Sequence, residues 1–253
     1  MGDYDSSKTR VAPVFDRLLE LDPTGSSWLD RLLRLPEGFD EAPRPAVGKP
    51  GRLIRHAWYP DEHLIRPPLA LLRWLVSRPT QDWPPEFRRE AATGSPQRDR
   101  LVGQDELARQ EALALLEAGA PDRAWYVLEG PTHVDAYLEA ENLTVVVEGK
   151  RTEPAPTIRT KWMSTRHQML RNLDAVWDGG KPAYGFFAVE ARDGSDDVPP
   201  EWQDFVRQTV SSEALEGSLP HRSGEEQASI KQAFLGATTW QRISSEFGLP
   251  RPE

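Results

Sequence analysis

The sequence predicts an α/β fold in which helices cover a mixed β-sheet. Residues 132–150 consist of two apolar segments around a polar turn, which is typical of a β-hairpin, and residues 183–190 form another apolar strand pattern. Residues 105–118 and 161–177, on either side of the hairpin, instead repeat their apolar side chains at the helical period. With a short strand predicted at 125–128, the order is helix, strand, hairpin, helix, strand.

Turn residues mark where these elements end. Gly119 and Pro121 end the first predicted helix, and Gly130-Pro131 ends the short strand. Gly179-Gly180 ends the helix predicted over 161–177. The elements therefore follow one another with short connections.

The register of the hairpin decides which charged residues meet. If the loop is Glu141-Asn142, Asp135 lies directly opposite Glu148. Opposed residues share a face of the sheet, with Cβ atoms about 4.5–5.5 Å apart. Lys150, two residues beyond Glu148, points to that same face. A four-residue loop preserves this pairing, whereas a three-residue loop breaks it.

Two carboxylates held this close repel each other unless they share a proton or a cation. Oxygen ligands of this kind suit Mg²⁺ or Mn²⁺, with water completing the shell. The structural alternative is that Glu148 and Lys150 form an edge-strand ion pair and that Asp135 merely begins a strand. Three charges beside a Val-rich, two-faced apolar strand favour the metal site.

Val134-Asp135, twelve intervening residues and Glu148-Gly149-Lys150 resemble the motif of the PD-(D/E)xK nuclease superfamily. Val134 stands where that motif usually has proline. The resemblance covers residues 99–190 and implies a restriction-endonuclease-like fold with an αβββαβ core, a central mixed sheet flanked by helices. It also implies that the chain hydrolyses phosphodiester bonds in DNA, with Asp135, Glu148 and Lys150 as catalytic residues. Asp135, Glu148 and the Gly149 carbonyl would hold Mg²⁺ or Mn²⁺.

Further candidate residues lie on the two predicted helices. The superfamily often places a Gln and a basic residue on the helix after the E-x-K strand, which suggests nucleic-acid contacts for Arg166, Gln168 and Arg171. Arg166 falls within the apolar arc, so a buried salt bridge is its alternative; for Gln168 and Arg171 the alternative is a solvated helix face. Glu111, between Leu107 and Leu115, is expected toward the packed side of its helix. It is a candidate metal ligand there, or a carboxylate that reaches water.

Composition narrows the remaining possibilities. The chain has 253 residues, no cysteine and a net charge of −9, so disulfides and Cys-based metal sites are excluded. Neither a signal peptide nor an apolar run of membrane-spanning length is present, and the expected location is the cytoplasm. Despite the acidic total, residues 150–171 hold six Lys or Arg against one Glu. That basic stretch adjoins the predicted metal site.

We expect three regions in the chain. Residues 1–98 form a Pro- and Trp-rich elaboration packed on the core, 99–190 form the nuclease core, and 191–253 form a helical extension. The competing function is a catalytically silent nucleic-acid-binding or protein-interaction module on the same fold, with the N-terminal region docking a protein partner. The residues do not distinguish DNA from RNA, and they leave open whether the chain forms a homodimer.

Overall fold

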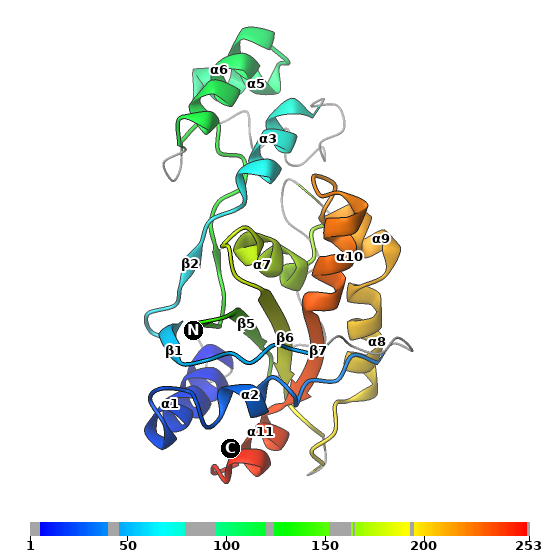
Figure 1. Ribbon diagram of the computed structural model, residues 1–253. Coiled ribbons are helices and arrows are strands. Elements are labelled where there is room, and N and C mark those ends of the chain that lie inside the picture. The colour runs from blue at the N-terminus through cyan, green and yellow to red at the C-terminus, as the bar shows by residue number, and fades with distance from the viewer. Residues whose placement is uncertain are drawn as a thin grey trace.

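The computed structural model describes residues 6–39, 46–78, 95–119, 124–151, 163, 165–192 and 195–251 (Figure 1). Its centre is a five-stranded mixed sheet flanked by helices, which confirms the predicted α/β class. The first two pairings across the sheet are antiparallel, and the last two are parallel. In spatial order the strands are β1 (Leu53–Trp58), β4 (Ala136–Ala140), β5 (Thr144–Gly149), β6 (Ala183–Val189) and β7 (Phe234–Thr239).

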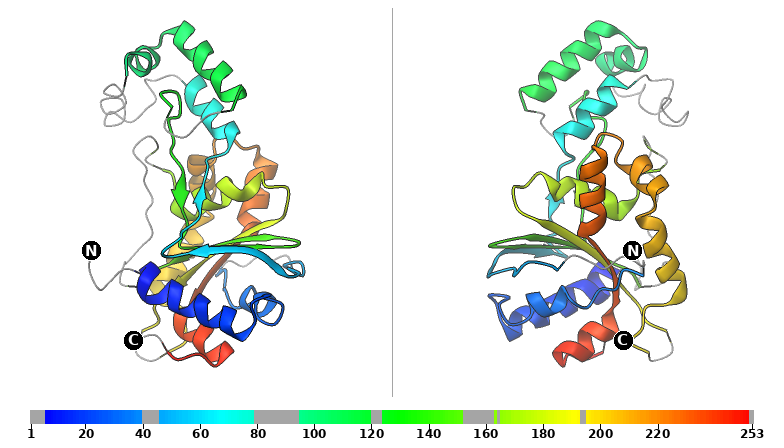
Figure 2. Two further views of the ribbon diagram at one scale, coloured as in Figure 1. Left: turned by 90° about the vertical axis from the view of Figure 1, so that its left-hand side faces the viewer. Right: turned by 45° about the vertical axis from the view of Figure 1, so that its right-hand side comes forward.

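Helices cover both faces of this sheet (Figure 2). One face packs against η1 (Ser7–Val11), α1 (Ala12–Leu21), α2 (Leu29–Leu32) and α11 (Trp240–Phe247). The other packs against α7 (Gln168–Trp177), α8 (Pro200–Thr209), α9 (Ser212–Ser218) and α10 (Gly224–Ala233). Every residue of β5 is buried, as expected for an apolar strand covered on both sides.

A separate helical lobe extends from one end of the molecule (Figure 1). It contains α3 (Leu69–Ser77), α5 (Pro96–Val102) and α6 (Glu106–Glu117), which share their own apolar cluster. Two short paired strands, β2 (Leu64–Ile65) and β3 (Thr132–His133), lead to it. The helix predicted over 105–118 therefore forms, capped by Asp105, but packs in this lobe.

The predicted hairpin register is confirmed. The Ala140 amide donates to the Leu143 carbonyl at 2.8 Å, so the loop is Glu141-Asn142. Ala136 pairs with Val147 at the other end of the hairpin. The next positions along the two strands are Asp135 and Glu148, which the same register places side by side.

Two predicted elements differ from the structure, one in its type and one in where it begins. Residues 125–128 form a turn because Arg98 donates to the carbonyls of Ala124, Trp125 and Val127, which occupies acceptors that a strand would need. The outer antiparallel strand comes instead from β1, in the N-terminal region. Helix α7 begins at Gln168, later than predicted; Met163 and 165–167 are not helical, and 161, 162 and 164 lie outside the described residues.

The C-terminal region is not wholly helical. The extension over 191–253, predicted as helical, contains β7 between α10 and α11. Pairing with β6 and burial on both faces override the local helical spacing there. The sheet thus draws strands from all three predicted regions, so 99–190 is not a self-contained core.

Predicted elements elsewhere agree with the structure. The strand expected over 183–190 is β6, and the N-terminal region contributes the helices α1, α2 and α3. Gly185 of β6 lets α7 approach closely, because a Cβ there would lie 2.8 Å from the Met169 sulfur and 3.1 Å from Leu173. Within the described residues, none of the helices has the length and apolar character needed to cross a membrane.

Candidate functional site

The three predicted catalytic residues meet at one end of the β4–β5 hairpin. Asp135 occupies a bend immediately before β4, Glu148 lies near the end of β5, and Lys150 follows that strand directly. The Lys150 ammonium lies 3.5 Å from a Glu148 carboxylate oxygen. Glu148 is 1% exposed and the Lys150 side chain 12%, so this ion pair is largely shielded from water.

Helix α7 supplies the hydrogen-bond donors for Glu148. The Gln168 amide donates to Oε2 at 2.8 Å, and the Asn172 amide donates to Oε1 at 2.6 Å. Thr132 donates to the Asn172 carbonyl oxygen at 3.0 Å, which orients that amide. Gln168 therefore lies at the site as a partner of Glu148, and its contact with nucleic acid stays a prediction. Asn172 was missed, although its position one helical turn after Gln168 was a usable signal.

The N-terminal segment provides the partners of Asp135. The Ser7 hydroxyl donates to Asp135 Oδ1 at 2.7 Å, and the Gly149 amide donates to Oδ2 at 2.8 Å. The Ser6 hydroxyl donates to the Gly149 carbonyl at 2.9 Å. Ser6 and Ser7 were not predicted, because they lie more than a hundred residues from the motif and match no local pattern.

Glu148 is the electrostatically strained group of the site. Burial, and then the neighbouring charge of Asp135, raise its pKa well above the usual range, while Lys150 and the Asn172 hydrogen bond oppose this. The opposing contacts do not fully compensate. A second cation beside Glu148 and Asp135 would stabilise both ionised carboxylates and so oppose the rise in the pKa of Glu148.

The oxygen donors present fit a magnesium ion. Mg²⁺ is commonly held by one or two carboxylates, with waters and substrate oxygens filling the other positions. Asp135, Glu148 and the Gly149 carbonyl provide hard oxygen atoms of this kind. No cluster of three or more His, Cys, Asp or Glu side chains suited to a metal occurs in the described part of the chain.

Glu111 does not join this set. It is exposed on α6, in the helical lobe, whereas the buried face of that helix consists of Ala108, Ala112 and Leu116. The expectation that Glu111 faces the packed side is therefore wrong. The expectation took Leu107 and Leu115 to mark the packed face of the helix, but Leu107 is itself 70% exposed.

Arg166 is structural, as its alternative interpretation proposed. Its side chain is fully buried, donates to Asp174 at 2.6 Å and to the Ser218 carbonyl, and lies 3.9 Å from Glu129. The predicted contact of Arg166 with nucleic acid is therefore wrong for this arrangement. A buried arginine in a predicted apolar arc needs carboxylate partners, and the chain provides them.

Arg171 belongs to the same group of charges. It donates to Glu129 at 2.7 Å and to the Gly130 carbonyl at 3.1 Å, with 23% of its side chain exposed. It is thus neither a solvated side chain nor one directed at the metal-site residues. Its exposed fraction leaves contact with nucleic acid as a prediction.

Buried charges hold α7 in place beneath the site. Burial alone would raise the pKa of Asp174, but Arg166 and His221 outweigh it and keep that pKa below its usual range. Arg222 donates to Asp174 at 2.8 Å as well. Burial raises the pKa of Glu129, with Arg166 and other cations opposing. This network fixes the helix that presents Gln168 and Asn172.

Comparisons with protein-family models, curated proteins and solved structures find no match to this chain.

Gly149 leads to a prediction about stability. A Cβ at this position would lie 2.6 Å from Val11 and 3.0 Å from Trp240, both fully buried. Gly149→Ala should destabilise the fold by about 1–3 kcal/mol through overpacking, measured by urea unfolding. Gly48→Ala is the control, because a Cβ there meets nothing within 4 Å. Equal stability of both variants and wild type would contradict the packing argument.

The raised pKa of Glu148 predicts a pH dependence. The folded state holds this proton more tightly than the unfolded chain, where glutamate has a pKa of about 4.3. The associated stability is present below that pH and is lost as pH rises through the folded pKa. In EDTA, the ionisation of Glu148 should therefore lower the melting temperature as the pH rises above about 5.

Asp135→Asn tests the cause of this fall. This substitution removes the negative charge of Asp135, which raises the pKa of Glu148, and keeps an oxygen that accepts from the Gly149 amide. The fall in melting temperature should become smaller in this variant. Asp204→Asn, at a side chain 65% exposed, is the matched control and should follow wild type. A wild-type pH profile for Asp135→Asn would show that Asp135 does not act on Glu148.

Proposed function

We propose that the chain is a metal-dependent phosphodiester hydrolase that acts on DNA. The observation that carries this proposal is the placement of Asp135 beside Glu148 at the end of one hairpin, with Lys150 3.5 Å from Glu148. A buried titratable residue with a perturbed pKa, such as Glu148, is common at catalytic sites. DNA as substrate follows from the sequence resemblance, and the residues themselves imply attack on a phosphate.

We also propose that the fold is restriction-endonuclease-like. The antiparallel β4–β5 hairpin, the α7 crossover and the parallel β6 strand support this, because they follow one another as the αβββαβ core requires. The upstream part departs from that core: α6 lies in the helical lobe, and β1 takes the place of the strand predicted at 125–128.

Each residue has a defined part in the proposed chemistry. A bound Mg²⁺ would supply charge neutralisation at the phosphate and activation of water. Asp135, Glu148 and the Gly149 carbonyl would hold it. Gln168 and Asn172 fix both oxygens of Glu148, so the carboxylate is positioned before substrate arrives.

Lys150 is the residue assigned to the attacking water. Its ammonium, anchored 3.5 Å from Glu148 and little exposed, lies where it can orient a water beside the carboxylates. Its positive charge also stabilises the negative charge that develops on the phosphate oxygens during attack. The shielding of this ammonium from solvent strengthens that effect.

One observation favours a second candidate function, a catalytically silent binding module. Ser7 and the Gly149 amide already satisfy Asp135, and Ser6 satisfies the Gly149 carbonyl. Such contacts would stabilise the hairpin without any metal. Carboxylate oxygens accept several interactions each, so the same contacts are also compatible with the hydrolase. Cleavage and metal binding distinguish the two candidates.

The first test is cleavage by a Lys150 variant. Lys150→Met removes the ammonium while keeping much of its volume, and should reduce Mg²⁺-dependent cleavage of DNA by at least about 100-fold. Lys181→Met is the matched control, because Lys181 pairs with Glu139 at 2.9 Å at the other end of the hairpin. Cleavage is measured on supercoiled, linear and single-stranded DNA, with RNA alongside. Wild-type activity in Lys150→Met would end the catalytic assignment.

The second test is metal-induced stabilisation. A cation that binds only the folded protein raises the melting temperature, with a free-energy gain of about RT ln(1 + [L]/Kd). Mg²⁺ or Mn²⁺ should therefore stabilise wild type and Asp204→Asn, and this rise should disappear in Asp135→Asn, whose remaining carboxylate lacks its partner. A metal response that survives intact in Asp135→Asn would favour the silent module.

A further inference from the structure

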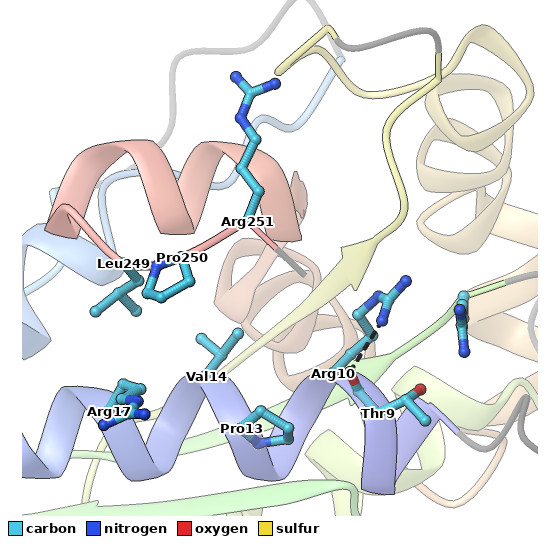
Figure 3. Close-up of a pocket in the computed structure, with 9 residues that line it drawn as sticks. Thr9, Arg10, Pro13, Val14, Arg17, Leu249, Pro250 and Arg251 are labelled. Atoms are coloured by element: carbon cyan, nitrogen blue, oxygen red, sulfur yellow. Dashed lines mark hydrogen bonds between the residues drawn. The ribbon is translucent and has the colours of Figure 1, made fainter. Parts of the chain in front are cut away.

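A pocket of about 440 Å³ lies between the η1–α1 segment and the tail that follows α11 (Figure 3). Four of its lining residues are arginines, and none is Asp or Glu, in a chain whose net charge is −9. This pocket therefore concentrates positive charge on an acidic protein. Its lining consists of Thr9, Arg10, Pro13, Val14, Arg17, Arg151, Leu249, Pro250 and Arg251.

Arg10 is the fixed member of the four. Its side chain is 4% exposed, and its Nε lies 2.6 Å from Glu190, while Nη1 donates to the Thr9 carbonyl. Glu190 in turn accepts from Gln241. These contacts hold the guanidinium at one end of the pocket, so little conformational entropy is lost when a ligand binds to it.

Arg17 and Arg251 are the exposed members. Each has a carboxylate partner outside the lining, Glu20 at 2.5 Å and Asp196 at 3.0 Å, but the two arginine side chains are 58% and 55% exposed. Exposed pairs of this kind contribute little free energy. Each guanidinium also carries five N–H donors. A phosphate can therefore compete with these carboxylates for both arginines.

The pocket combines this charge with an apolar surface. Figure 3 shows Leu249 and Pro250 facing Val14 of α1, with Arg10 and Arg17 toward opposite ends. Guanidinium groups bind phosphate through paired hydrogen bonds, and the apolar surface suits a sugar or base. A volume of about 440 Å³ is in the range of small-ligand sites. The lining thus fits one nucleotide unit.

Chain connectivity places the pocket next to the candidate metal site. Arg151 directly follows Lys150, and Arg10 follows Ser7, which donates to Asp135, within about one helical turn. The pocket and Asp135 are therefore linked through η1 and through the residues that follow β5. A strand of double-helical DNA carries one phosphate for about every 3.4 Å of helix axis.

We propose that this pocket binds a phosphate-bearing nucleotide of the strand whose neighbouring phosphodiester lies at Asp135 and Glu148. The proposal rests on the proposed function for the strand, but the charge and shape of the pocket stand independently of catalysis. A free nucleotide has the same chemistry, and the experiment separates the two sources.

The test uses Arg17→Glu/Arg251→Glu, with Arg34→Glu as matched control. Arg34 is 72% exposed, pairs with Asp30 and lies outside the pocket. Binding of labelled single-stranded and duplex DNA, and separately of AMP, is measured with Ca²⁺ replacing Mg²⁺. We expect DNA affinity at least about tenfold weaker in the double variant, with the salt slope smaller by about one per lost phosphate contact, and no change in Arg34→Glu.

Melting temperatures confirm that each variant folds, and Arg17→Gln/Arg251→Gln replaces the double variant if charge reversal unfolds it. DNA affinity equal to that of Arg34→Glu would overturn the proposal. Wild-type binding of AMP but not of DNA would overturn the strand assignment in favour of a free nucleotide. Loss of DNA binding in the double variant, with no cleavage by wild type, would support the pocket and reject the hydrolase. If wild type cleaves DNA and the double variant retains both full cleavage and unchanged DNA binding, the hydrolase is supported and the pocket is rejected.

Discussion

The buried carboxylate of Glu148 is the constraint on which the rest of the site depends. A carboxylate that is 1% exposed and adjacent to a second acid needs donors on every side. Gln168, Asn172 and Lys150 provide them, and each comes from an element that packs directly against β5 or continues it. Burial of the Glu148 charge therefore requires α7 to lie where Gln168 and Asn172 can donate to it.

A network of buried ion pairs holds α7 in this position. Arg166 joins Asp174 and Glu129 beneath α7, while Arg222 and Arg171 complete the network from neighbouring segments. Removing one partner of a buried ion pair leaves an uncompensated charge, which costs several kcal/mol, about 3–5. The orientation of α7 therefore depends on buried ion pairs in addition to its contacts with Glu148.

The N-terminal segment links the site to its surroundings. Its serines contact Asp135 and Gly149, Val11 packs where a Cβ on Gly149 would stand, and Arg10 continues into the arginine-lined pocket. One segment therefore closes the hairpin end and forms one wall of the pocket. This arrangement explains why the residue between Glu148 and Lys150 is glycine: a larger side chain would displace the segment.

By itself, the sequence determined the α/β class, the hairpin register and the meeting of Asp135, Glu148 and Lys150, because strand alternation and a two-residue loop are local properties. Gln168 was singled out by the resemblance to the nuclease superfamily. Only the tertiary structure decided the strands β1 and β7, the exposed position of Glu111, the burial of Arg166 and the roles of Ser6, Ser7 and Asn172. These depend on contacts between distant segments, where burial and pairing outweigh local propensity.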